Sequence, residues 1–408
     1  MSILLEEDLK LELPKMFKIK QKFPDVRLFN VEDAVKEQFN KPDIISKIKP
    51  GQKIAVAVGS RGIKNLLSIV KVTVELIKEI GGMPFIVSAM GSHGAGTEQG
   101  QRQILESYGI TEENLGISIL TTVDVEKIGK TSKGTDVYFD KAALGADLVI
   151  PINRVKLHTD FVGEIQSGLC KMLVIGLGNQ IGCSSIHEEN LDVFSNIIEE
   201  AASIIINNVN VGFGIAIIEN GYDETAMIEF LPSENIISRE KELLKIAKNF
   251  MPTLMIPEID VLIVNEIGKN ISGAGFDPNI LGKSAILKKF VLKVPNIKRM
   301  VLLDITEESH GNGIGVGMFD IITRKVFNKL DLDPMYTNAI ASKVIEDVKI
   351  PLITDTEEEA IKVAIKACRN LDKANLKIVK IKNTLELEHI EVSETLLDYA
   401  RSSKNFIV

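Results

Sequence analysis

The sequence predicts an α/β protein built from two doubly wound domains. Its 408 residues are enough for two or three domains of roughly 150 residues each. Short apolar runs alternate with amphipathic segments, a pattern typical of parallel strands covered by helices on both faces. Between them, the stretch 249–259 is interrupted by Pro252 and Pro257. We therefore predict a domain boundary there, with an N-terminal α/β domain at 1–252 and a C-terminal one at 253–408.

Apolar periodicity gives the individual elements. Helical spacing of apolar residues predicts helices at 65–80 and 191–205. A third helix is expected at 357–369, where Thr356 and Glu359 form a capping-box pair. We expect the last ~25 residues to pack back on the first domain. Short apolar runs predict strands at 53–59, 84–90, 146–152, 171–177, 211–218, 260–267, 299–305 and 350–354.

Composition narrows the class of partner and compartment. The formal net charge is −8 and no basic block is present, which argues against a nucleic-acid or anionic membrane surface and favours a small-molecule partner. The three cysteines form no CxxC motif, so neither a disulfide framework nor a four-cysteine zinc site is expected. The N-terminal residues lack a signal-peptide pattern and no apolar run suits a spanning helix, so a cytoplasmic location is expected. The oligomeric state is not predicted.

Two histidines follow predicted strands, where ligands of α/β proteins bind. His93 lies in MGSHGAGT after the strand 84–90, and its flanking glycines allow backbone to approach a ligand closely. An imidazole there suits proton transfer, although a turn histidine without chemistry is the alternative. His158 lies in a loop rich in titratable residues after the strand 146–152. For that loop the alternative is a solvated charged connection.

Lys171 and His187 are candidates for holding a cofactor. Lys171 opens the predicted apolar strand 171–177, so its amine is partly desolvated, as in nucleophilic or anchoring lysines. Snorkelling from a strand end is the alternative. His187 is either a helix-entry residue or a metal ligand. A three-ligand site with Cys170 and Cys183 would have a spacing unusual for zinc.

Two glycine-rich stretches are weaker signals. GLGNQIG at 176–182 loosely resembles a dinucleotide fingerprint, which raises an NAD-dependent oxidoreductase as an alternative function. The stretch 308–320 follows a predicted strand and is a candidate anion-binding nest. Within it His310 is expected to be structural, whereas His389 is expected to be exposed.

Taken together, these motifs resemble the nickel-dependent lactate racemase family, and the resemblance spans roughly residues 50–330. The separation of 16 residues between Lys171 and His187 is its most specific element. The motifs are GSR at 59–61, GSH at 91–93, His158, SGLCK at 167–171, His187 and EIGKN at 266–270.

The resemblance implies a cofactor and the residues that hold it. Family members have two α/β domains with the active site in the cleft between them, and use a nickel-pincer nucleotide, a pyridinium mononucleotide whose carbon and sulfur atoms hold nickel. Lys171 would anchor it covalently through a thioamide, and His187 would complete the nickel coordination. Ser60 and Gly168 would contribute to cofactor binding. Separate cofactor-biosynthesis proteins would then be partners of this chain.

The resemblance also implies an isomerase that inverts C2 of a 2-hydroxy acid by proton-coupled hydride transfer. Inversion through a planar 2-keto acid needs one base on each face of the substrate, and His93 and His158 occupy the matching positions. Arg61 and Lys269 would hold the substrate carboxylate or polarise its oxygen. Besides the oxidoreductase, a non-catalytic binder of the nickel nucleotide or of a sugar acid remains an alternative.

Several positions depart from the family pattern. Val58 stands where an aspartate is usual, and Gly94 where an arginine is usual. His158 precedes Lys171 by 13 residues, about three more than the pattern, and Leu169-Cys170 replaces a glycine-arginine pair. These differences favour a substrate other than lactate. A sugar acid is plausible because polar side chains that could accept further hydroxyls surround the motifs: Asp160, Glu164, Gln166 and Asn270.

Overall fold

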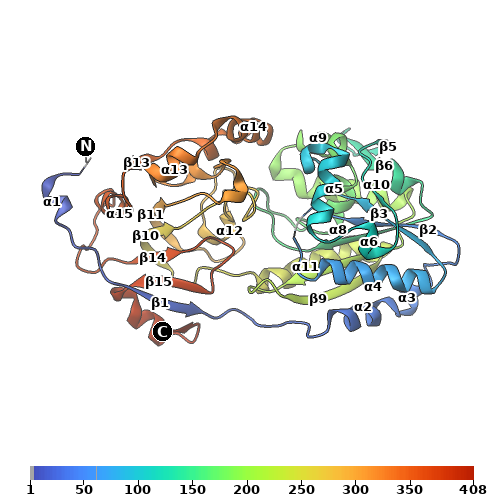
Figure 1. Cartoon of the computed structure of the whole chain (residues 1–408), viewed down its shortest axis with the longest axis horizontal. Helices are drawn as coiled ribbons and strands as arrows, with labels where there is room; N and C mark the ends of the chain where they lie inside the picture. The colour runs from blue at the N-terminus through green and yellow to red at the C-terminus, as the bar shows by residue number, and fades with distance from the viewer. Residues whose placement is uncertain (1–3, 61) are drawn as a thin grey trace. The chain divides into compact units, whose positions relative to one another are not determined.

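The computed structural model describes residues 4–60 and 62–408, and it confirms the α/β class. The chain folds into two compact units (Figure 1). One unit is Pro24–Met251, and the other combines the residues up to Phe23 with Pro252–Val408. The observed division therefore differs from the predicted domains in its N-terminal segment, which belongs to the unit that carries the C-terminus.

The unit Pro24–Met251 is built on a six-stranded sheet of order β4-β3-β2-β7-β8-β9. All neighbours are parallel except β8 and β9, which form an antiparallel pair. The central strand is buried on both faces, as expected of a sheet covered by helices. The strands are β2 (Lys53–Val58), β3 (Met83–Ser88), β4 (Ile119–Leu120), β7 (Leu148–Arg154), β8 (Phe213–Glu219) and β9 (Thr225–Pro232), with a separate hairpin of β5 (Val125–Lys130) and β6 (Asp136–Asp140).

Amphipathic helices cover this sheet. In α4 (Leu66–Glu79) the buried side chains recur at helical spacing, and they join β2, β3 and β7 in one apolar core. The predicted helices at 65–80 and 191–205 correspond to α4 and to α10 (Phe194–Asn208). The other helices are α2 (Val31–Phe39), α3 (Pro42–Ile45), α5 (Glu98–Ser107), α6 (Glu112–Leu115), α7 (Lys141–Leu144) and α11 (Ile236–Phe250).

The second unit contains an eight-stranded mixed sheet of order β13-β12-β11-β10-β14-β15-β1-β16. Strands β13 to β14 in this order are parallel, and the remaining pairs are antiparallel. The strands are β1 (Met16–Gln21), β10 (Glu258–Val264), β11 (Asn296–Leu302), β12 (Ile321–Thr323), β13 (Leu352–Thr354), β14 (Ile378–Ile381), β15 (His389–Ser393) and β16 (Phe406–Ile407). The helices are α1 (Glu6–Leu9), α12 (Pro278–Leu281), α13 (Arg324–Lys329), α14 (Leu332–Ser342), α15 (Glu357–Lys366) and α16 (Leu397–Ser402).

Strand pairing explains why the N-terminal segment belongs to this unit. β1 lies between β15 and β16, so its backbone groups are paired on both edges by the C-terminal part of the chain. The chain ends in β16, which pairs with β1. The predicted helix start at Thr356 is observed as well, because its hydroxyl accepts a hydrogen bond from Glu359 N–H at the start of α15.

The predicted strand 171–177 is wrong, because this segment is helical. α8 (Leu169–Lys171) runs directly into the π-helical turn η2 (Met172–Gly176), and α9 (Asn179–His187) follows after a bend of 107°. Every side chain of η2 is buried, so the run is apolar all round and has the same pattern as a buried strand.

No single helix in the described ranges is long and apolar enough to cross a membrane, although the bent pair Leu169–Gly176 and Asn179–His187 passes the same test on length and composition alone.

Replacing Gln21 is expected to destabilise the second unit. The fully buried side chain donates to the carbonyl oxygens of Leu387, at 2.7 Å, and Thr253, at 3.3 Å, and accepts from Met255 N–H at 2.8 Å. Gln21→Ala leaves these buried groups unpaired and should lower the free energy of unfolding by about 2 kcal/mol, measured by urea unfolding. The exposed Gln103→Ala serves as control. Equal stability of both variants would contradict the prediction.

Candidate functional site

Lys171 lies in the first turn of the helix Leu169–Gly176, and its half-buried amine contacts the imidazole of His158 through Nε2. On the other side of the ring, Asp160 N–H donates to His158 Nδ1 at 3.1 Å. This donation leaves the proton of a neutral imidazole on Nε2. The Lys171 amine and His158 Nε2 lie within hydrogen-bonding distance, an arrangement that suits a nucleophilic lysine next to a proton-transfer group.

Aromatic contacts connect this pair to His187. The His158 ring stacks on Phe161 with centroids 4.3 Å apart, and Lys171 Nζ lies 5.9 Å from the centroid of Phe161. Phe161 contacts Phe194 edge-to-face at 4.9 Å, and Phe194 contacts His187 in the same way at 5.1 Å. Three residues predicted from scattered motifs therefore lie around one aromatic cluster. The two phenylalanines were not predicted, because single aromatic residues in apolar segments give no sequence signal beyond the core.

His187 ends α9, where its side chain is exposed. Its Nδ1 lies 2.6 Å from the carbonyl oxygen of Cys183, which can only accept, so Nδ1 carries a proton and Nε2 carries the lone pair of the neutral ring. The Cys183 sulfur lies 3.5 Å from the same nitrogen. Desolvation alone would lower the pKa of His187, but the contact with Cys183 raises it above its usual value, and the nearby charge of Lys171 opposes this shift.

The candidate metal ligand of this region is the single imidazole of His187 and not a group of several ligating side chains. Within residues 4–60 and 62–408, no three His, Cys, Asp or Glu side chains are arranged to hold a metal ion. The three-ligand alternative with Cys170 and Cys183 is therefore wrong. Cys170 is fully buried, and burial, together with the neighbouring Glu240, raises the pKa of its thiol.

His93 contacts Ser60, a residue that was predicted to contribute to cofactor binding. The hydroxyl of Ser60 contacts His93 Nδ1, and the carbonyl oxygen of Ser60 accepts from Tyr108 O–H at 2.8 Å. A hydroxyl can donate to this ring nitrogen or accept from it, and the contact fixes the orientation of the imidazole. Arg61, the adjacent predicted residue, lies outside the described residues.

Backbone contacts attach the loop of His93 to the helices of Lys171 and His187. Gly91 N–H donates to the carbonyl oxygen of Gly176 at 3.0 Å, and Cys183 Sγ lies 3.7 Å from Ser92 Oγ. The fully buried Gln101 fixes the same loop, donating to the Gly91 carbonyl oxygen at 3.3 Å. Gln101 was not predicted, since a glutamine within a helix is usually exposed.

Gly168 is packed between two polar side chains. Its carbonyl oxygen accepts from Asn153 Nδ2 at 2.7 Å. A Cβ at this position would lie 2.5–2.6 Å from the carboxylate atoms of Glu240, so a larger residue would displace that carboxylate. Packing thus explains this glycine, and its role in cofactor binding stays a prediction.

Glu240 is a buried carboxyl group directly below the start of the lysine helix. It is 1% exposed, and its Oε2 accepts hydrogen bonds from Leu169 N–H and from Cys170 N–H, the latter at 3.0 Å. Burial raises the pKa of Glu240 to about 7, against the lowering effect of these two hydrogen bonds. Sequence analysis missed Glu240, because a single glutamate among the charged residues of α11 has no distinguishing spacing.

Lys269 lies in the other unit, in the loop after β10. Its backbone N–H donates to Ser309 Oγ at 2.9 Å, and its amine donates to the Gly273 carbonyl oxygen at 3.1 Å. His310 adopts a left-handed conformation at φ 46° in a neighbouring turn and is exposed. His389 is exposed as predicted.

The glycine run 176–182 does not form a phosphate-binding loop. A dinucleotide fingerprint needs a strand, a turn and the start of a helix, whereas here Gly176 ends η2 and Gly182 lies inside α9. These glycines allow close packing: a Cβ on Gly176 would lie 2.8 Å from the Ala89 carbonyl oxygen, and one on Gly178 would lie 2.5 Å from that of Val174. The run therefore gives no support to an NAD site.

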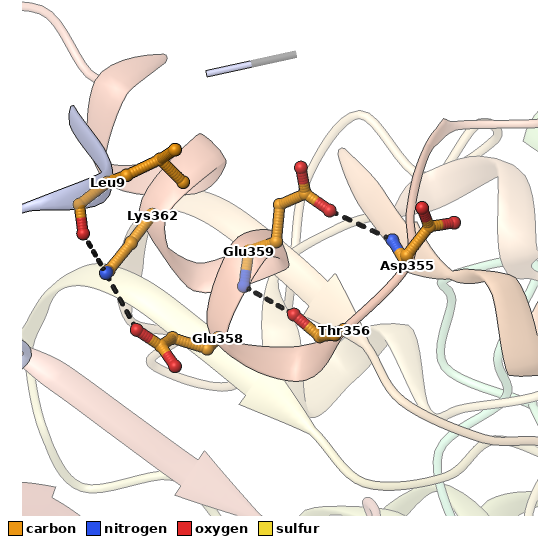
Figure 2. Close-up of a pocket in the computed structure, with 6 residues that line it drawn as sticks. All are labelled: Leu9, Asp355, Thr356, Glu358, Glu359 and Lys362. Atoms are coloured by element: carbon orange, nitrogen blue, oxygen red, sulfur yellow. Dashed lines mark hydrogen bonds and ion pairs between the residues drawn. The ribbon is translucent and has the colours of Figure 1, made fainter. Parts of the chain in front are cut away.

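A pocket of about 340 Å³ lies on the second unit, apart from all of these residues. Figure 2 shows that Lys362 crosses it and donates to the carbonyl oxygen of Leu9 at 2.6 Å, besides pairing with Glu358 at 2.7 Å. The lysine therefore ties the α1 segment to α15. The lining residues are Leu9, Asp355, Thr356, Glu358, Glu359 and Lys362.

The buried carboxyl of Glu240 should make stability depend on pH. Its pKa rises from 4.5 to about 7 on folding, so the unfolded chain ionises first and stability falls as pH increases between these values. Glu240→Gln removes this loss and should gain roughly 3 kcal/mol over wild type between about pH 5 and pH 8. Urea unfolding at both pH values measures it. A pH-independent difference between the two proteins would contradict the assignment.

Comparison with known proteins gives a family-model match and a similar solved structure. Residues 10–196 match the family model of the lactate racemase N-terminal domain. The fold is similar to the structure of the lactate racemase apoprotein from Thermoanaerobacterium thermosaccharolyticum, with a TM-score of 0.54 and 14% sequence identity. The match covers 91% of this chain and 99% of that one. No curated protein matched the sequence.

The matched family model contains the segments of Ser60, His93, His158, Lys171 and His187, which the structure brings together in the unit Pro24–Met251. The chain thus contains a region similar to the lactate racemase N-terminal domain, within a fold similar to that of the lactate racemase apoprotein.

Proposed function

We propose that the protein is a racemase or epimerase that inverts C2 of a 2-hydroxy acid. The observation that carries this proposal is the contact of the Lys171 amine with His158, within an aromatic cluster that also contains His187. It combines an anchoring nucleophile, a proton-transfer group and a possible metal ligand in one lactate racemase-like domain.

The residues present fit a nickel-pincer nucleotide. The half-buried amine of Lys171 lies beside an imidazole, which suits a covalent bond to the cofactor, and His187 Nε2 is proposed to bind nickel because Nδ1 donates to the Cys183 carbonyl oxygen. One imidazole is sufficient where the cofactor itself supplies carbon and sulfur ligands. Ser60 and Gly168 are proposed to contact the nucleotide. When bound, the cofactor supplies a reversible acceptor for the C2 hydride.

The two histidines are proposed to carry the protons. One imidazole takes the proton of the substrate hydroxyl as C2 becomes planar, and an imidazole on the opposite face serves the other enantiomer. Ser60 orients the His93 ring through Nδ1. His158 is oriented by Asp160 and by stacking on Phe161.

Positive charge is proposed to bind the substrate carboxylate. Arg61 and Lys269 have this role by resemblance to the family, and the site between the domains stays a prediction. A substrate with further hydroxyls, such as a sugar acid, would suit the polar side chains near the motifs. We also propose a cytoplasmic location, on the composition of the chain.

Covalent attachment at Lys171 is the direct test of the cofactor. The chain co-expressed with the cofactor-biosynthesis proteins should gain one adduct on Lys171 and roughly one nickel per chain, and Lys171→Ala should lose both together with all isomerase activity. Intact-mass and peptide mass spectrometry with elemental analysis measure this. Lys245→Ala, an exposed lysine of α11, is the control. An active chain with no adduct and no nickel would exclude the proposal.

Replacing either predicted base should reduce turnover strongly in both directions. His93→Gln and His158→Gln should each lower kcat by about 10²- to 10⁴-fold, since each removes a general acid–base group. The readout is polarimetry or chiral chromatography on a panel of hydroxy and sugar acids, and His389→Gln is the exposed control. Net oxidation of a hydroxy acid with NAD would favour the oxidoreductase instead, and tight binding without isomerisation would favour the binder.

A further inference from the structure

The start of the lysine helix is held by a buried carboxyl group that lies outside the family motifs. Both oxygens of Glu240 lie below the segment Gly168–Cys170, and Oε2 accepts the N–H groups of Leu169 and Cys170. These N–H groups belong to the first turn of the helix, where no backbone acceptor is available within the helix itself. The next residue along the chain is Lys171. Glu240 therefore acts on the lysine through its backbone.

Capping a helix with a buried carboxyl group is energetically unfavourable. Glu240 forms no ion pair with Lys, Arg or His in the described part of the chain, and its Oε1 is buried without a hydrogen-bond partner. The adjacent Lys241 instead pairs with Glu199 and Glu164. Burial of an unpaired carboxyl group is unfavourable, so we expect Glu240 to have a role that outweighs this cost. A serine or asparagine cap at Gly168 would have served the helix alone.

Several groups around Gly168 hold the start of the lysine helix in place. Asn153 Nδ2 holds the Gly168 carbonyl oxygen at 2.7 Å, while Glu240 fills the space where a side chain of residue 168 would lie. Met172 N–H closes the first turn on the same carbonyl oxygen at 3.1 Å. The peptide on both sides of Lys171 is thus held before its side chain reaches His158.

We propose that Glu240 is a positioning residue that sets the orientation of Lys171 toward His158 through the backbone N–H groups of residues 169 and 170. The proposal rests on the proposed function of Lys171, although the contact that it explains is present in the cofactor-free chain. The matched substitutions are Glu240→Gln, which keeps an acceptor oxygen of similar size, and Glu240→Met, which keeps volume but removes both acceptors.

The test follows the imidazole that contacts the lysine. With five histidines in the chain, the Cε1–H proton signals are few, and the signal lost in His158→Gln identifies His158. NMR titration of the cofactor-free full chain should show the His158 midpoint shift in Glu240→Met by about 0.5 pH units or more, toward its value in Lys171→Ala. Glu240→Gln and the exposed Glu242→Gln of the same helix should stay within about 0.2 pH units of wild type.

Each outcome decides the proposal. A wild-type His158 midpoint in a folded Glu240→Met, with Lys171→Ala shifted, would reduce Glu240 to a stability element and overturn it. An unshifted Lys171→Ala would also overturn it, because the contact would then not govern His158. If Glu240→Met does not fold, Gly168→Ala displaces the carboxylate and must give the same shift. Absence of a Lys171 adduct in co-expressed protein would refute the proposed function and leave this titration result unchanged.

Discussion

The bend of 107° between two buried helical segments is the constraint on which the candidate site depends. It places Lys171 at the beginning of the first segment and His187 at the end of the second, around the same aromatic cluster. Asn179 makes the bend possible by adopting φ 49°, and its amide donates to Asp140 at 2.8 Å. The glycines on both sides permit close packing where side chains would collide. The apolar sequence of these segments is therefore required for the fold, whereas their ends carry the candidate site residues.

The parallel strands and amphipathic helices of the first unit could be predicted because apolar residues recur at one regular spacing along each of them. β2 was expected at 53–59 and is observed at Lys53–Val58, and α4 was expected at 65–80 and is observed at Leu66–Glu79. The segment 171–177 could not be assigned in this way, since a helix buried on every side is as continuously apolar as a buried strand. The position of β1 in its sheet could not be predicted either, because its strand partners lie more than 360 residues later in the chain.

Some of the candidate site residues could be predicted from the sequence, and others could not. Lys171, His93, His158 and His187 carry sequence signals because rare titratable residues stand next to glycines or at the ends of apolar segments. The residues that orient them have no such signal. Phe161 and Gln101 resemble ordinary apolar or helical positions, and Glu240 becomes notable only when its burial against the helix start is known. Sequence patterns thus identify the candidate reactive groups, while tertiary packing determines their orientation.

The unusual spacing of His158 from Lys171 has a local structural explanation. Lys156 and Ser167 exchange two backbone hydrogen bonds, of 2.9 and 3.2 Å, and so close the intervening loop at its base. Extra residues inside a closed loop change its course without moving the strand before it or the helix after it. Within the loop, His158 N–H donates to the buried Gln166 side chain at 2.7 Å, and the imidazole of His158 contacts Lys171. A longer loop can therefore keep the same pair of residues in contact, so spacing along the chain is a weaker criterion for the second base than closure of the loop that carries it.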